Sequence, residues 1–217
     1  LSRYIFNTIY ISLGATVGCL IIGSMAAYAI SKVRFPGFNV VFQLIVYSLM
    51  ISSTVTGIAH FLVFVALKWL NTYTISIVPM WASTLGLYLM KNFIDDGISD
   101  EMVEAARIDG AGWFSIYWKI TLPLSKTALL TVGLMYALQF WNDWWNALMF
   151  VREKDLWPLQ YYLYNILSNV NAISSGRIPA GAAANIKLPS ETVKMAVTII
   201  TIGPILFAYP FIQKYFV

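Results

Sequence analysis

The sequence predicts an all-α, polytopic membrane protein, a bundle of transmembrane helices. Of its 217 residues, 59% are hydrophobic and only 11% are charged, and the mean hydropathy is +0.70. Soluble domains carry about 25% charged residues, because their surface must face water. The few charges are also unevenly spaced, leaving long apolar runs between them. These observations exclude a soluble enzyme and a disordered chain.

Each long run with few or no charges is a candidate transmembrane helix. A bilayer requires about 20 apolar residues per helix, whereas barrel strands are about 10 residues long and alternate in polarity. The fourth run, between Lys126 and Arg152, is interrupted only by Asp143. We therefore expect five helices, near residues 5–31, 39–67, 73–92, 121–150 and 192–213.

The first expected helix contains Gly14 and Gly18 at a spacing that permits close helix packing, although two small residues can also fall there by chance. The turn at 32–37 is basic and contains no acids, which favours the cytoplasmic side. Two longer polar segments, 93–119 and 151–191, are the places where sizeable extramembrane structure can lie.

Residues 99–112 predict a short helix outside the membrane. Ser99 can cap its start, and Asp100 and Glu101 suit the positive end of the helix dipole. Gly110 can end the helix in a left-handed conformation. Ala105 and Ala106 present almost no side chain, so another protein can approach this helix closely.

The same segment resembles the EAA loop of ABC importer permeases. Glu104, Ala105, Ala106, Gly110, Ile120, Leu122 and Pro123 match that signature in residue type and spacing. The resemblance implies a cytoplasmic coupling helix that docks on an ATP-binding subunit, with the contact carried by Glu104, Ala105, Ala106, Asp109, Gly110, Ile120, Leu122 and Pro123. The alternative is an amphipathic surface helix that reads EAA by chance.

The resemblance extends along most of the chain. Residues 26–37 look like the end of the second membrane helix of maltose-type carbohydrate permeases, and residues 144–148 and 156–160 are similar to the polysaccharide and oligosaccharide subgroup. The implied fold is that of a type I ABC importer permease: one permease domain, 1–217, with the coupling loop at 93–119 and an outer loop at 151–191. The family's first helix has no counterpart here, so six helices are expected in the full subunit.

The resemblance also implies the assembly and its location. The expected partners are a second homologous permease, two ATP-binding subunits, membrane lipid and an extracytoplasmic solute-binding protein, which residues 151–191 would receive. No cofactor is expected on this chain, because ATP and Mg belong to the ATP-binding subunits. The location is the bacterial cytoplasmic (inner) membrane.

A polar stripe is expected in the fourth helix. Gln139, Asn142, Asp143 and Asn146 are spaced to share one face, and Trp141, Trp144 and Trp145 flank it. A carboxylate inside the membrane usually faces a cavity or a partner. Carboxylate, amides and flat rings together suit a sugar, so Gln139, Trp141, Asn142, Asp143, Trp145 and Asn146 are candidates for the substrate path. Interfacial anchoring or helix–helix contact is an equally good interpretation.

Other function classes fit less well. His60 is the only histidine, Cys19 is the only cysteine, and the sequence contains neither a Gly-x-Ser-x-Gly turn nor a clustered metal-ligand set. There is no G-x-x-x-x-G-K-[ST] loop, so if transport is powered by ATP, another subunit must supply the ATP-binding site. The net charge of +4 is explained by the basic residues that flank transmembrane helices and gives no reason to expect nucleic-acid binding. The remaining alternative is a stand-alone channel or ion-coupled secondary transporter.

Overall fold

The computed structural model describes residues 1–33, 35–174, 195, 198–199 and 202–203, and its described elements are all helical. They belong to two compact units, Leu1–Ile11 with Trp141–Val217 and Ser12–Phe140, which are treated separately below. The helix expected at 192–213 and the outer-loop residues 175–191 lie largely outside the described residues.

Helix α1 (Ser2–Tyr28) continues into a π-helical turn, η1 (Ala29–Val33). Together they form one apolar helix of 32 residues, Ser2–Val33, which is long enough to cross a membrane. This agrees with the helix expected at 5–31. The last turn is π-helical, a local distortion of the helix that occurs frequently at functional sites.

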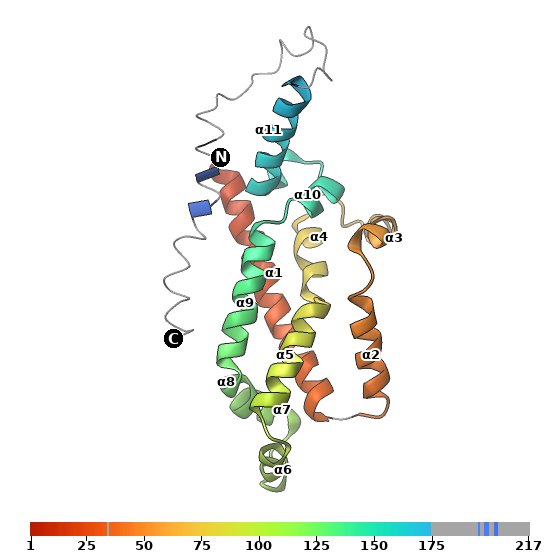
Figure 1. Cartoon of the computed structure of the whole chain (residues 1–217), viewed down its shortest axis with the longest axis vertical. Helices are drawn as coiled ribbons and strands as arrows, with labels where there is room; N and C mark the ends of the chain where they lie inside the picture. Colours follow the sequence, from red (N-terminus) through yellow and green to blue (C-terminus); the bar gives the residue numbers. More distant parts are fainter. Residues whose placement is uncertain (34, 175–194, 196–197, 200–201, 204–217) are drawn as a thin grey trace. The chain divides into compact units, whose positions relative to one another are not determined.

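The expected helix at 39–67 is wrong as a continuous element. The chain forms α2 (Phe38–Ser48) and α3 (Ser53–Ala66), separated at residues 49–52 (Figure 1). At the break, the backbone N–H groups of Leu49, Met50 and Ile51 each donate to a carbonyl three residues earlier. The Ser48 hydroxyl also donates to the Ile45 carbonyl at 2.7 Å, a side-chain bond that bends helices.

The next apolar segment, Tyr73–Gly97, has 25 residues and again meets the length of a membrane span. It consists of α4 (Tyr73–Ile77), the 3-10 turn η2 (Val78–Trp81) and α5 (Thr84–Gly97). Pro79 lies in the first turn of η2, where its missing N–H is tolerated. The Ser83 side chain caps α5 by accepting the N–H of Gly86.

The core of the unit Ser12–Phe140 lies where α1, α5 and α9 (Lys126–Trp141) pack together (Figure 1). Its centre includes Ala15, Cys19, Ile94, Val132 and Tyr136, each at most 3% exposed. Glycines permit the close approach. A Cβ on Gly133 would lie 2.9 Å from the Leu20 side chain, and one on Gly86 would lie 2.8 Å from the Tyr136 ring.

The expected helix at 121–150 is also wrong in its bounds. Three short elements, α7 (Trp113–Ile116), η3 (Tyr117–Thr121) and α8 (Leu122–Leu124), precede α9, and the chain bends by 76° between Trp113–Leu124 and Lys126–Trp141. Pro123 explains part of the bend, because it has no N–H to continue the helical bonding. By length and composition, the described residues contain two membrane-spanning helices, or three if the bent pair is one span.

After α9 the chain forms α10 (Trp145–Phe150), the 3-10 turn η4 (Lys154–Leu156) and α11 (Leu159–Ser174). In the unit formed by Leu1–Ile11 and Trp141–Val217, the N-terminal turns of α1 contact the segment around η4. Asn7 is fully buried, and its amide nitrogen donates to the carbonyls of Asp155 at 2.8 Å and Trp157 at 3.0 Å. The Thr8 hydroxyl accepts the N–H of Leu159 at 2.8 Å, which fixes the start of α11.

Candidate functional site

Helix α6 (Asp100–Ile108) is the short helix that the sequence predicts at 99–112, and both expected end signals are present. The Ser99 side chain accepts the N–H of Met102 at 3.3 Å. At the other end Gly110 has a φ of +83°, its N–H donates to Arg107, and the N–H of Ala111 donates to Ala106. This pair of bonds is the Schellman arrangement, which needs a residue in the left-handed region and therefore favours glycine.

One face of α6 packs inward and the other is exposed. Val103 is 4% exposed and Ala106 is half-buried against the core. Glu104, Ala105 and Asp109 are exposed. The helix therefore exposes Glu104 and Ala105 of the EAA triplet, whereas Ala106 packs against the core of the protein.

Ile108 is a surface feature that the motif does not name. It is a large apolar residue and is 86% exposed, compared with 41% for Met102 on the same helix. It stands three and four positions after Ala105 and Glu104, so the three lie on neighbouring turns of one face. The available sequence signal was an isoleucine in the last turn of a helix flanked by charges.

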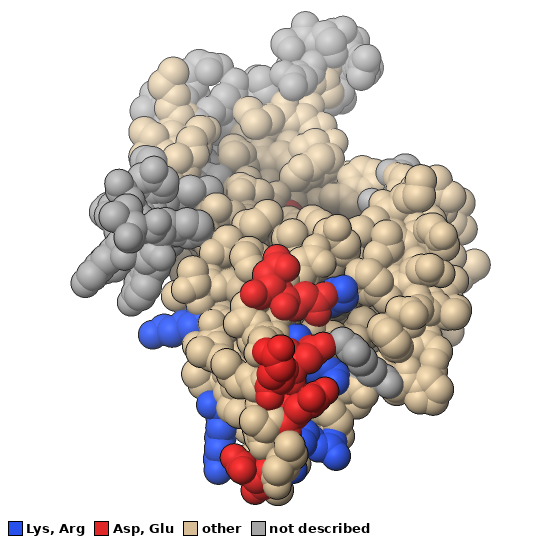
Figure 2. All heavy atoms as spheres, turned by 60° about the horizontal axis from the view of Figure 1, so that its bottom comes forward, with Lys and Arg blue, Asp and Glu red and all other residues tan. Residues whose placement is uncertain are grey.

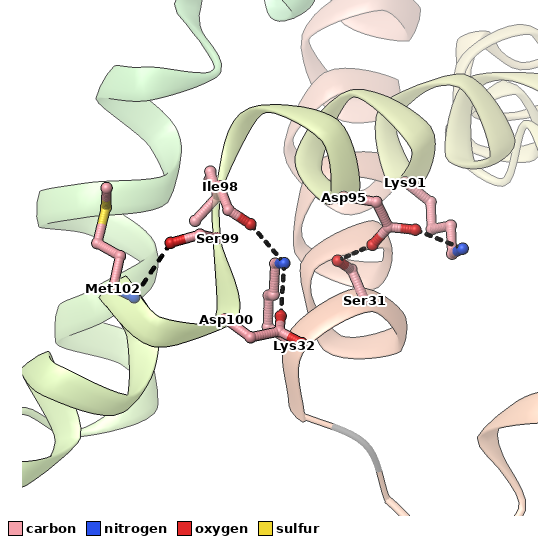
Figure 3. Close-up of polar contacts among 8 residues, drawn as sticks. All are labelled: Ser31, Lys32, Lys91, Asp95, Ile98, Ser99, Asp100 and Met102. Atoms are coloured by element: carbon pink, nitrogen blue, oxygen red, sulfur yellow. Dashed lines mark hydrogen bonds and ion pairs between the residues drawn. The ribbon is translucent and has the colours of Figure 1, made fainter.

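Lys32 holds the start of α6 from the end of α1 (Figure 3). Its ammonium donates to the Ile98 carbonyl at 2.6 Å and forms an ion pair with Asp100 Oδ1 at 2.8 Å. The Lys32 side chain is 4% exposed, whereas that of Asp100 is 46% exposed. The sequence marked Lys32 only as part of a basic turn, and its partners lie 66 and 68 positions away.

Asp95 connects the end of α1 to a different element, helix α5. Its carboxylate accepts the hydroxyl of Ser31, which lies on η1 beside Lys32, and forms an ion pair with Lys91 at 2.5 Å (Figure 3). Lys91 and Asp95 are both on α5, one turn apart. The end of α1 is thus bonded to α5 through Ser31 and to α6 through Lys32.

The segment after α6 is also bonded to α1. The Tyr28 hydroxyl donates to the Trp113 carbonyl at 3.2 Å, and the hydroxyls of Ser24 and Tyr117 lie 2.7 Å apart. The Arg107 guanidinium lies 4.2 Å from the centre of the Trp113 ring, a cation–π contact. Of the later motif residues, Ile120 and Leu122 are half-buried against the core, and Pro123 is exposed.

The exposed surface around α6 is acidic and contains a hollow. Acidic side chains gather over the ends of α5 and α6 with basic groups beside them (Figure 2); the exposed acids are Asp95, Asp96, Asp100, Glu101, Glu104 and Asp109. A hollow of about 460 Å³ lies along α6, lined by Lys32, Asp100, Val103, Glu104, Arg107, Ile108 and Trp113. The arrangement suits a partner protein with a complementary surface.

The polar stripe does not form one helical face. Helix α9 ends at Trp141, and the chain is not helical at Asp143 and Trp144 before α10 begins. The Asp143 carboxylate, one residue before the N-cap Trp144, accepts the first two N–H groups of α10, those of Trp145 at 3.1 Å and Asn146 at 3.3 Å. These bonds explain why the helix stops, because Asp competes well for backbone donors at a helix start.

The other path candidates lie around this break. The amide of Asn146 donates to Asp143, and the Asn142 side-chain oxygen accepts from Gln160 at 3.0 Å. Trp145 is 40% exposed, Trp141 is half-buried, and Gln139 is exposed on α9. These contacts give Asp143, Asn142 and Asn146 structural roles, and their lining of a path stays a prediction.

Comparison with known proteins gives a consistent result. The family described as "Binding-protein-dependent transport system inner membrane component" matches residues 19–217. Protein LplC of Bacillus subtilis (strain 168) is 33% identical over 226 residues, 99% of this chain and 74% of LplC. The polygalacturonan/rhamnogalacturonan transport system permease protein YtcP of the same organism is 34% identical over 224 residues, 99% of this chain and 77% of YtcP.

A solved structure is similar as well. It is the crystal structure of a bacterial ABC transporter involved in the import of the acidic polysaccharide alginate. One of its chains is 32% identical to this chain and has a TM-score of 0.84, covering 99% of this chain and 75% of that one.

Proposed function

This chain belongs to the family of binding-protein-dependent transport system inner membrane components, and on that premise we propose that it moves an oligosaccharide or polysaccharide fragment inward, driven through α6. It is a multi-pass permease subunit of an ABC importer in the inner membrane. It is not an enzyme, since ATP is hydrolysed by separate subunits of such importers. Family membership argues against a stand-alone channel or a secondary transporter.

The observation that carries the coupling role is the exposed face of α6. Glu104, Ala105 and Ile108 stand outward on a helix capped by Ser99 and closed by Gly110. Small and apolar side chains at the centre of this face permit close approach by a partner protein. The acidic side chains around them would complement basic residues at the rim of the partner's surface. We assign Glu104, Ala105 and Asp109 to the contact with the ATP-binding subunit. The half-buried Ala106, Ile120 and Leu122 pack against the core, and we assign to them the transfer of any displacement of α6 to the membrane helices. Gly110 sets the end of the helix, and Pro123 contributes to the bend that follows.

The proposed complex contains this subunit, a second homologous permease, two ATP-binding subunits and an external solute-binding protein. ATP and Mg²⁺ are bound by the ATP-binding subunits, and their closure displaces α6 at the membrane surface. Two alternative arrangements of the helices, one open inward and one open outward, are then biased by the nucleotide state. The external binding protein is received by the outer loop, residues 151–191.

The proposed substrate class follows from the relatives. YtcP is named for polygalacturonan and rhamnogalacturonan, and the similar structure is described for alginate. These are acidic carbohydrate polymers, so fragments of such polymers are the first substrates to test. A panel of charged and neutral oligosaccharides, offered to the reconstituted complex with its binding protein, identifies the preferred one. Uptake of none of them would contradict the carbohydrate assignment.

The coupling role is tested in the assembled complex. Glu104→Lys places a cation at the contact, and Gly110→Pro removes both the left-handed φ and the N–H that bonds Arg107. We expect both variants to insert normally and to hydrolyse ATP without proportional uptake. Gly110→Asn is the matched control, because Asn tolerates the left-handed region. Normal uptake per ATP in both altered variants would reject the assignment, and failure to co-purify any ATP-binding subunit would favour a channel.

A further inference from the structure

We propose that Lys32 is a positioning residue that makes α1 move together with the coupling helix. This inference rests on the proposed role of α6 and adds a specific mechanical link to it. Along the chain, α6 is joined to α5 at one end and to α7 at the other, and α1 is separated from it by more than 60 residues. Any direct coupling to α1 must therefore pass through side-chain contacts.

The first support is the position of the two bonds. The Lys32 ammonium lies at the start of α6, bonded to the Ile98 carbonyl before the cap and to the Asp100 carboxylate in the first turn (Figure 3). Both acceptors are on the segment that a docked partner would displace. Lys32 itself is on η1, the last turn of the 32-residue helix Ser2–Val33. A displacement of α6 is thus applied at the very end of a long helix.

The second support is the burial of the cation. The Lys32 side chain is 4% exposed, so its partners shield the ammonium from most contact with water although it borders the hollow along α6. Separating a buried ammonium from its acceptors leaves an uncompensated charge, which is strongly unfavourable. The bonds therefore persist when α6 moves, and the end of α1 follows. An exposed lysine at the same place would release its partners at little cost.

The third support is that the residue next to Lys32 bonds a different helix. Ser31 bonds Asp95 on α5, whereas Lys32 bonds α6, so adjacent residues of η1 hold two different elements. Lys91 shares the Asp95 carboxylate within α5. The chain thus offers a matched comparison between a lysine at the proposed link and a lysine beside it.

The test measures substrate imported per ATP hydrolysed in the reconstituted complex. For Lys32→Met, we expect assembly with the ATP-binding subunit and a fall of about fivefold or more in this ratio, the usual range of coupling between sites. Lys32→Arg keeps the charge and its donors and should retain most of the ratio. Asp100→Ala should also lower it, whereas Lys91→Met should leave it unchanged.

The outcomes separate this inference from the proposed function. A normal ratio in Lys32→Met and Asp100→Ala overturns the link, even if Glu104→Lys still uncouples transport. A normal ratio in the Glu104 and Gly110 variants as well overturns the role of α6 itself. If Lys32→Met does not assemble, Asp100→Ala decides by the same criterion. A ratio lowered equally in Lys91→Met would indicate a general structural effect and would also overturn the proposal.

Discussion

The indole of Trp81 occupies the space above Gly18 where a side chain would otherwise begin. A Cβ on Gly18 would lie 1.9 Å from Trp81 Nε1, and the same nitrogen donates to the Gly14 carbonyl at 3.0 Å. Of the two glycines that the sequence marked as a packing pair, Gly18 admits the Trp81 ring, whereas a Cβ on Gly14 would lie 3.3 Å from the Ile77 side chain.

We expect Gly18→Ala to destabilise the protein by about 1–3 kcal/mol, the usual range for overpacking. The matched control is Gly23→Ala on the same helix, since a Cβ there would contact nothing within 4 Å. That substitution should be neutral or stabilising by up to about 1 kcal/mol. Thermal unfolding of the purified protein in detergent measures both, and equal stability of the two variants would contradict the packing described.

Ile108 is expected to contribute to the docking of the ATP-binding subunit. Ile108→Asp should leave the stability of the isolated permease unchanged, because the side chain is 86% exposed. Its affinity for the ATP-binding subunit should fall by about 2 kcal/mol, or roughly 30-fold, if it fills a pocket on the partner. Ile108→Leu serves as the control. Co-purification yields that do not differ between the two variants would count against this contact.

Substitution of Asp143 is expected to lower the stability of the protein, whether or not it also affects transport. Asp143→Ala removes the acceptor of two N–H groups in the first turn of α10 and should cost about 1 kcal/mol. Asp143→Asn keeps an acceptor oxygen and removes the charge, so stability should change by less than about 0.5 kcal/mol. Unfolding measurements on both variants, paired with uptake assays, distinguish the roles. Lost uptake in a fully stable Asn variant would show that the charge itself serves the transport path.

Asn7 is expected to be intolerant of a carboxylate. Asn7→Asp replaces a donor to two carbonyls with a buried anion facing the same oxygens, which should cost about 3 kcal/mol or more. Asn169→Asp is the control, because that amide is exposed on α11. Limited proteolysis at residues 153–159 reports the effect. Unchanged cleavage rates in Asn7→Asp would mean that this segment is held by other contacts.

Local signals were predictable from the sequence, and long-range ones were not. The ends of α6 depend on Ser99 and Gly110, whose bonds involve neighbours within four residues, so they could be identified directly. Charge spacing predicted where apolar segments lie, but it is insensitive to breaks in the backbone. It therefore missed the turn at 49–52, the bend at Ser125 and the interruption at Asp143. The burial of Lys32 depends on residues that are distant along the chain, which no local pattern encodes.

The buried Cys19 has a practical consequence for observing this protein at work. It is the only cysteine of the chain and is 2% exposed within the packed core. Thiol reagents should therefore modify a newly introduced surface cysteine in preference to the native one. A pair of cysteines introduced at exposed positions could then carry spectroscopic labels without first removing Cys19, and the change in their separation would be followed during a turnover cycle.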